Sequence, residues 1–398
     1  MGRKLLLLLA SAALSLGVAE MVLRFAFPYV GWRQFEDVGL GWSSAEYQRF
    51  DPLATPPREG VKRMLFLGDS FIAGAGVTGL DKRFPVLLGE RLGEGWEVAI
   101  LASAGWGTDQ ELLAYVQKGM AWQPDVVILV FCANNDLANN LSNGDWRGSR
   151  KPYFVLADDG QLQLFDSGGV PLDLAAERAQ RPVLLQSYLF DLLRFQFLAV
   201  PPAERTADSP IQATVQPESV DPRYLRFDAP SEKPSELWKG TKLSWSPEEG
   251  VNHVSAYIQE SFETNTYQWE LFQGILGQLE QATRASGAEL VVMLLPVTFR
   301  PLDLRFVVGS AYEQYYETPS GGFTFRAAEP RDRVRQAAES VGVGFYDPSG
   351  QFLGQIQARG LRGAAWSDPG DRHFSDVAHS LLAELMEQDV KTGLVQLP

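Results

Sequence analysis

Short, largely apolar segments recur along the chain, and each is bounded by polar or turn-forming residues. They are rich in β-branched and aromatic residues, and each has the length of a strand buried inside a parallel sheet. The five segments are Met64–Leu67, Trp96–Leu101, Val126–Phe131, Leu290–Leu295 and Val343–Tyr346.

Most of these segments are separated by stretches in which apolar residues recur at helical spacing. These stretches predict helices over Phe84–Leu92, Asp109–Met120, Tyr267–Ser286, Arg331–Val341 and Ser375–Gln388. Ser375 is the expected N-cap of the last helix. Strands that alternate with helices predict an α/β fold, with a parallel sheet covered on both faces.

The alternation is interrupted between residues 141 and 250. This stretch contains scattered aromatic residues and several prolines, it is too long for a loop, and it lacks the periodicity of another strand and helix. We interpret it as a partly irregular insertion beside the site edge. The predicted organisation is an N-terminal segment (1–27), a linker (28–60), the first part of a catalytic domain (61–140), the insertion (141–250) and the second part of the domain (251–398).

The N-terminal segment has the pattern of an export signal. Arg3 and Lys4 precede an uncharged apolar stretch from Leu5 to Ala19, and further apolar residues follow Glu20. The expectation is an uncleaved signal anchor with its basic end in the cytoplasm. The alternatives are a signal peptide cleaved after Ala19 and a buried N-terminal helix. Either export reading places the catalytic part outside the cytoplasm, in the periplasm or at the cell surface.

Composition excludes some function classes. The formal net charge is −14, which argues against a nucleic-acid partner because no basic surface would neutralise phosphates. The only cysteine, Cys132, follows a buried-strand segment and forms no intrachain disulfide. With three histidines and no cysteine cluster, neither a zinc site nor any cofactor is expected.

The candidate chemistry begins at Gly68-Asp69-Ser70, which ends the first predicted strand. A serine hydroxyl becomes a nucleophile when a base lies within hydrogen-bond reach and a carboxylate orients that base. His373 supplies the base, and Asp371 supplies the carboxylate, with Asp368 as the alternative acid. The two other histidines are weaker candidates for the base: His379 falls within a predicted helix, and His253 has no carboxylate partner in a recognisable motif.

Two further motifs follow the second and third strands and supply donors for an oxyanion. Gly105 lies in the turn-forming run Ser103–Gln110, in which Asp109 could cap the next helix. Asn134 and Asn135 are adjacent after the third strand, and the side-chain amide of either one could be aimed at the same point.

These blocks, in this order, resemble the SGNH/GDSL hydrolase superfamily over residues 61–140 and 262–390. The resemblance implies a three-layer α/β/α sandwich of flavodoxin-like type, with Ser70 as nucleophile, His373 as base and Asp371 as its acid. It also implies that Gly105 and Asn135 form the oxyanion hole. The run from Gly105 to Gln110 is similar to exported members of the family. Two departures stand out: Ala133 replaces the usual glycine of the third block, and Asp371 and His373 are separated by one residue rather than two.

The shorter spacing is familiar from membrane-associated, polysaccharide-modifying members. The resemblance therefore implies a serine esterase that removes small acyl groups, O-acetyl foremost, from an extracytoplasmic glycan. The alternatives are an O-acetyltransferase, a lipase or thioesterase, and a non-catalytic assembly factor. Trp106 and Trp366 lie beside two of the blocks, so each is a candidate for lining the substrate site.

Overall fold

The computed structural model describes residues 57–133, 135–143, 151–157, 160–166, 169–173, 255–296, 298–299, 305–306, 313–316, 322–361 and 373–392, and residues 4, 11 and 13–22 near the N-terminus. The structural statements below concern these residues.

The centre of the molecule is a five-stranded sheet in which all neighbouring strands are parallel. The strands are β1 (Lys62–Gly68), β2 (Trp96–Ala102), β3 (Val126–Phe131), β6 (Glu289–Leu294) and β11 (Gly344–Tyr346). Their spatial order is β11-β6-β3-β1-β2, which is the flavodoxin-like order, with β1 between β2 and β3. The predicted fold class and all five predicted strands are therefore confirmed.

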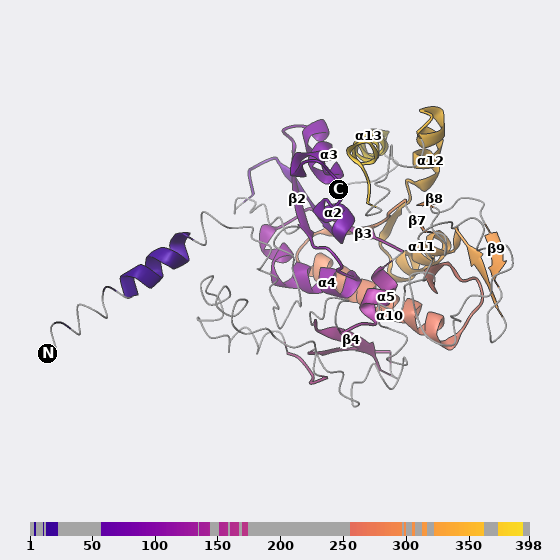
Figure 1. The fold of residues 1–398 in the computed structure, drawn as a ribbon, viewed down its shortest axis with the longest axis horizontal. Coiled ribbons are helices and arrows are strands. Elements are labelled where there is room, and N and C mark those ends of the chain that lie inside the picture. Colours follow the sequence, from indigo (N-terminus) through magenta and orange to yellow (C-terminus); the bar gives the residue numbers. More distant parts are fainter. Residues whose placement is uncertain are drawn as a thin grey trace.

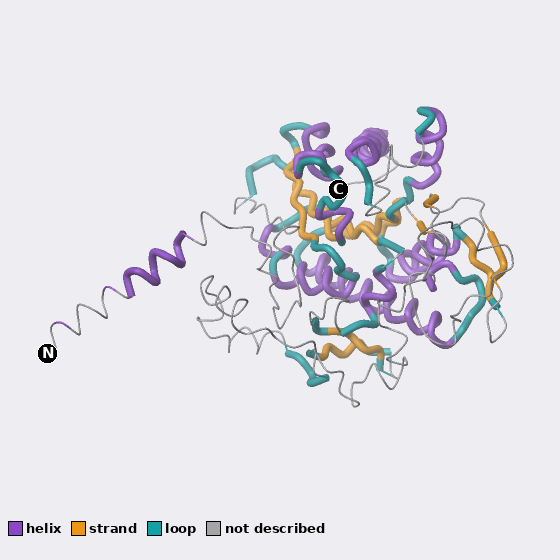
Figure 2. The backbone as a smooth tube through the Cα atoms, in the orientation of Figure 1, coloured by secondary structure: helices purple, strands orange, loops and turns teal. Residues whose placement is uncertain are grey.

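Helices cover both faces of the sheet, as Figures 1 and 2 show. On one face lie α3 (Phe84–Leu92), α12 (Ser349–Ala358) and α13 (Asp376–Thr392), and on the other lie α4 (Thr108–Gln117), α10 (Glu263–Ala285) and α11 (Glu329–Val341). Successive residues of β1 alternate between the two apolar layers: Leu65 and Leu67 contribute to one, and Met64 and Phe66 to the other. The strand is apolar throughout because both of its faces are buried.

Shorter elements complete the described part of the chain. The two short helices α2 (Ser70–Ala73) and α5 (Asp136–Asn140) follow β1 and β3 at the carboxyl edge of the sheet. The 3₁₀ turns are η1 (Leu80–Lys82), η2 (Gly119–Trp122) and η7 (Ser255–Tyr257). Small antiparallel pairs form between β4 (Tyr153–Leu156) and β5 (Leu162–Phe165), β7 (Thr298–Phe299) and β8 (Arg305–Phe306), and β9 (Glu313–Tyr316) and β10 (Phe323–Arg326).

The β4–β5 hairpin lies within the predicted insertion and packs on the main domain. The backbone N–H of Leu156 donates to the Tyr267 hydroxyl of α10 at 3.2 Å. Just before β4, the ammonium of Lys151 donates to the carboxylate of Asp109 in α4, and both side chains are fully buried. Because a buried charge is costly unless it is paired, this ion pair ties the start of the insertion to the first turn of α4.

Near the N-terminus, residues 13–22 are helical and mostly exposed, including Leu14, Leu16 and Val18. These described residues therefore do not form the buried N-terminal helix that was one of the alternatives. Within the described residues, no helix combines the length and the apolar character that a membrane crossing needs.

Candidate functional site

Ser70 is presented by a tight turn at the carboxyl end of β1. The strand ends at Gly68, Asp69 caps α2, and Ser70 is the first residue of that helix. The Asp69 carboxylate accepts a hydrogen bond from the backbone N–H of Phe71 at 2.9 Å. A Cβ on Gly68 would lie 2.3 Å from Cγ1 of Ile72, so glycine is needed for α2 to fold back this closely onto the strand.

The structure brings His373 to Ser70 although 303 positions separate them in sequence. Nε2 of His373 lies 2.7 Å from Oγ of Ser70, which is hydrogen-bond distance. The imidazole packs against the ring of Phe71 with a centroid distance of 4.7 Å, and Phe374 packs on the same ring at 5.1 Å. This aromatic cluster therefore joins Phe71, the residue directly after Ser70, to the imidazole that supplies the base.

A second attachment holds the segment after His373. The backbone N–H and the hydroxyl of Thr78 both donate to the carboxylate of Asp376, at 2.9 and 2.5 Å. Gly76 adopts φ +87°, and a Cβ there would lie 2.6 Å from the carbonyl oxygen of Phe374. The loop after α2 thus fits closely against the histidine segment, and only glycine permits this approach.

Among the other candidate acids and bases, His379 lies among the described residues and the rest do not. Asp371, Asp368, Trp366, His253 and Asn134 lie outside the described residues, so their predicted roles stay predictions. His379 is fully buried in α13, where its Nδ1 accepts from the backbone N–H of Phe84 at 3.1 Å. Burial lowers the pKa of His379 to about 3, so this imidazole is a neutral packing residue. The prediction that His379 packs within a helix is confirmed.

The two predicted oxyanion donors flank Ser70, because β1 lies between β2 and β3. Gly105 follows β2 with φ +77°, a left-handed conformation that favours glycine. Asn135 follows β3, and its Nδ2 donates to Oδ2 of Asp69 at 2.8 Å. Asp69 therefore links the serine turn to Asn135. The predicted cap of the next helix is wrong: Gly107 is the N-cap of α4, and Asp109 lies in its first turn.

Beneath this edge lies a layer of buried carboxyl groups. Asp69, Asp109, Glu111 and Asp136 are almost completely buried. Burial raises the pKa of each of them, and for Glu111 and Asp136 the rise is large because other carboxyl groups of the layer lie nearby. Within the described residues, neither carboxyl oxygen of Glu111 has a hydrogen-bond partner, and no cluster of three or more histidine, cysteine or acidic side chains could hold a metal ion. Burial and the neighbouring carboxyl groups therefore favour the neutral, protonated form of Glu111 in the folded protein.

This protonation predicts a pH dependence of stability. A carboxyl group whose pKa is raised by folding binds more protons in the native state than in the unfolded state. The free energy of unfolding therefore falls as pH rises from the unfolded pKa, about 4.3, toward the folded pKa, at up to about 1.4 kcal/mol per pH unit. Glutamine has no proton to lose, so Glu111→Gln removes this decrease in the free energy of unfolding. We therefore expect the thermal midpoint of the variant to rise relative to that of the wild type as pH is raised from 4 to 8.

The matched control is Glu339→Gln on the exposed surface of α11, where water solvates the carboxylate in both states. Its midpoint should follow that of the wild type across the same pH range. If the thermal midpoint of Glu111→Gln instead fell relative to that of the wild type as pH rises, Glu111 would be ionised in the folded protein.

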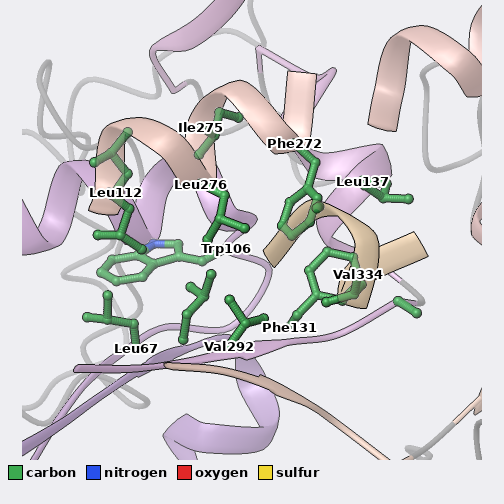
Figure 3. Close-up of a cluster of buried hydrophobic side chains, with 14 of the residues drawn as sticks. Leu67, Trp106, Leu112, Phe131, Leu137, Phe272, Ile275, Leu276, Val292 and Val334 are labelled. Carbon is green, nitrogen blue, oxygen red and sulfur yellow. The ribbon is translucent and has the colours of Figure 1, made fainter. Parts of the chain in front are cut away.

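The structure corrects the expectation for Trp106. Its side chain is fully buried and contributes to an apolar layer rather than to a substrate surface. Figure 3 shows the indole between Leu67 of β1 and Leu112 of α4, with Leu276 of α10 beside it. The turn after β2 directs the Gly105 backbone to the sheet edge and sends the next side chain into the core.

Several residues of the site carry no motif that sequence reasoning could have used. Thr78 and Asp376 are separated by 298 positions, and their contact depends on how the two loops meet. Asn139 bonds the backbone of the Gly105 loop from α5. Its only sequence signal is its place four residues after Asn135, one helical turn along.

A known protein family matches part of this chain. Residues 66–183 match the GDSL-like lipase/acylhydrolase family, and this match continues from the predicted first domain part into the insertion. No curated protein matches the chain.

Similar crystal structures include a protein from Parabacteroides merdae described as a GDSL-like lipase, with 13% identity, TM-score 0.38 and coverage of 84% of this chain and 99% of the other. An acetyl xylan esterase has 11% identity and a TM-score of 0.38, with coverage of 82% of this chain and 99% of the other. TesA has 13% identity and a TM-score of 0.36, with coverage of 83% of this chain and 99% of the other. These TM-scores are low, so the fold assignment rests on the observed order of the parallel strands.

Proposed function

We propose that this chain is a serine esterase that removes small acyl groups from an extracytoplasmic glycan, and the match of residues 66–183 to the GDSL-like lipase/acylhydrolase family supports this proposal. The observation that carries the proposal is the 2.7 Å separation between Oγ of Ser70 and Nε2 of His373. This pair lies at the carboxyl edge of the sheet where the strand order reverses, the place where open α/β folds bind ligands.

The proposed mechanism is acyl transfer through a covalent intermediate. His373 takes the hydroxyl proton of Ser70 as Oγ attacks the ester carbonyl, and Asp371 is the proposed acid that orients the imidazole. The backbone N–H groups of Gly105 and Ser70 and the amide of Asn135 stabilise the oxyanion. Asn135 has two amide hydrogens, so one can bond Asp69 while the other remains for the substrate.

The tetrahedral intermediate then expels the alcohol, which takes its proton from His373. Water attacks the resulting acyl-Ser70 ester, again with His373 as the base, and release of the carboxylic acid restores the hydroxyl of Ser70.

An O-acetyl group on a glycan is the proposed substrate, and its support is the sequence rather than a pocket. The basic residues Arg3 and Lys4 ahead of an apolar stretch favour export and anchoring in the membrane, where polysaccharides are within reach. The short spacing between Asp371 and His373 resembles polysaccharide-modifying enzymes. Fractionation of expressing cells tests the placement: catalytic chain found only in the cytosol would contradict it.

The test of the activity uses acetylated polysaccharide and nitrophenyl esters of acetate, butyrate and octanoate. We expect acetate release from the polysaccharide and a kcat/KM that falls with acyl length, because each methylene that misfits a pocket costs about 1–3 kcal/mol. A profile that rises with length would favour a lipase or thioesterase. Acyl transfer to an added glycan without hydrolysis would favour a transferase, and failure of a fluorophosphonate to label Ser70 would favour a non-catalytic protein.

A further inference from the structure

The orientation of the Gly105 N–H depends on a tight turn after β2. The backbone N–H of Ser103 donates to the carbonyl of Gly68 at the end of β1, and the N–H of Trp106 donates to the carbonyl of Ser103, at 3.3 and 3.2 Å. These bonds fix the two ends of a four-residue turn in which Gly105 is the third residue.

The peptide that joins Ala104 to Gly105 is the middle peptide of this turn. Two turn geometries share the same end residues and differ by a flip of that peptide, and a positive φ at the third residue selects one of them. Gly105 has φ +77°. Since the Gly105 N–H belongs to the middle peptide, whatever stabilises this turn geometry also sets the direction of the oxyanion donor.

Asn139 reaches this turn from α5. Its Nδ2 donates to the carbonyl of Gly105 at 3.1 Å and lies 3.4 Å from the carbonyl of Trp106. The helix and the loop are in close contact, since a Cβ on Gly107 would lie 2.8 Å from Cβ of Asn139. The side chain thus holds the carbonyls on the C-terminal side of the turn, at a point where only glycine leaves room for it.

The same helix also carries the other candidate donor. Asn135 is the N-cap of α5, and the N–H of Asn139 donates to the carbonyl of Asn135 at 2.7 Å. One helical turn therefore connects the side-chain donor of Asn135 with the bond that holds the Gly105 loop, so α5 fixes the two donors relative to each other.

We propose that Asn139 is a positioning residue for the oxyanion hole: it holds the Gly105 turn at a fixed distance and angle from Asn135. This inference rests on the proposed esterase function and extends it to a residue that touches no substrate. Donors aimed at a developing oxyanion act on the transition state more than on the bound ester, so loss of their alignment lowers kcat and leaves KM nearly unchanged.

The test compares Asn139→Ala and Asn139→Asp in the full chain with nitrophenyl acetate as substrate. The aspartate has the same shape but cannot donate to the two carbonyls when ionised, which keeps the test valid if the alanine protein fails to fold. We expect both variants to lose about 10–100-fold in kcat, less than the roughly 10²–10³-fold lost with a direct oxyanion donor, with KM within about twofold. The midpoint of the pH profile of kcat/KM should stay in place, because His373 and Ser70 are untouched.

The matched control is Asn265→Ala. Nδ2 of Asn265 also donates to a backbone carbonyl, that of Glu260 at 2.7 Å, and its Oδ1 accepts from the N–H of Phe262, at the start of α10. This variant should lower the thermal midpoint and leave kcat unchanged. Unchanged kcat in both Asn139 variants, a rise in KM alone, or an equal loss of kcat in Asn265→Ala would overturn the inference while the esterase function stands. A wild-type chain that hydrolyses no ester would overturn both.

Discussion

Replacement of Ser70 by alanine should remove esterase activity while the protein stays folded. Oγ of Ser70 is the atom within hydrogen-bond reach of His373, and no other atom of this serine can form the acyl-enzyme. Loss of a nucleophilic serine typically lowers kcat by about 10⁴–10⁶-fold, leaving what the oxyanion donors supply alone. The side chain is small and only partly buried, so the free energy of unfolding should change by about 0.5 kcal/mol or less. Steady-state hydrolysis of nitrophenyl acetate and a thermal melt measure both quantities.

The chain offers a close structural match as control. Ser349 is the first residue of α12 and is separated by two residues from the end of β11, at the same edge of the sheet. Its backbone N–H donates to the carboxylate of Asp347 as that of Phe71 donates to Asp69. Ser349→Ala should therefore keep full activity. If Ser70→Ala retained more than about a thousandth of wild-type kcat, another group would have to be the nucleophile.

Elements buried on both sides were predicted well from the sequence. The predicted bounds of β3 and α3 are those of the structure, because Val126–Phe131 is apolar at every position and Phe84–Leu92 is bounded by Arg83 and Gly93. The end of the helix predicted over Asp109–Met120 is wrong. The α-helix stops at Gln117 and a 3₁₀ turn follows, in which Gly119 packs so closely on Leu65 and Tyr115 that a Cβ would clash.

Other elements have sequence patterns too weak to predict a helix or a strand. The α12 helix contains two glycines and buries only Phe352 and Ile356 among its apolar residues, an i, i+4 pair that no periodicity analysis would select. The β9–β10 and β4–β5 pairs are four residues per strand, and short antiparallel pairs depend on the surface that they pack against rather than on their own pattern.

The candidate site, like the fold, could be predicted from the sequence only in part. The pairing of Ser70 with His373 could be predicted because the carboxyl ends of parallel strands share one edge. The buried carboxyl layer could not, since Thr108, Asp109, Gln110 and Glu111 form a polar run that normally lies at a surface. Here α4 is covered by α10 and α5, so the whole first turn is buried and Asp109 needs Lys151 as its partner. Only the tertiary contacts reveal this.

Trp106→Ala should behave as a core mutation and leave substrate preference unchanged. The indole is fully buried against Leu67, Leu112 and Leu276, and truncation of a buried Trp or Phe to alanine typically costs about 3–5 kcal/mol of unfolding free energy. We therefore expect a large drop in the urea midpoint. The ratio of kcat/KM for the acetyl ester to that for the octanoyl ester should remain that of the wild type, because no atom of the side chain reaches solvent.

Phe272→Ala is the control for this effect, since Phe272 of α10 belongs to the same apolar layer and is equally buried. Both variants should lose similar stability, and Trp106→Phe should recover much of it because the smaller phenyl ring still fills most of the space of the indole. The position of Trp106 directly after Gly105 makes some uniform loss of kcat compatible with a core role, as a loosened turn would affect every ester equally. A gain confined to the longer esters would instead mean that the indole closes the acyl pocket, and the core assignment would be wrong.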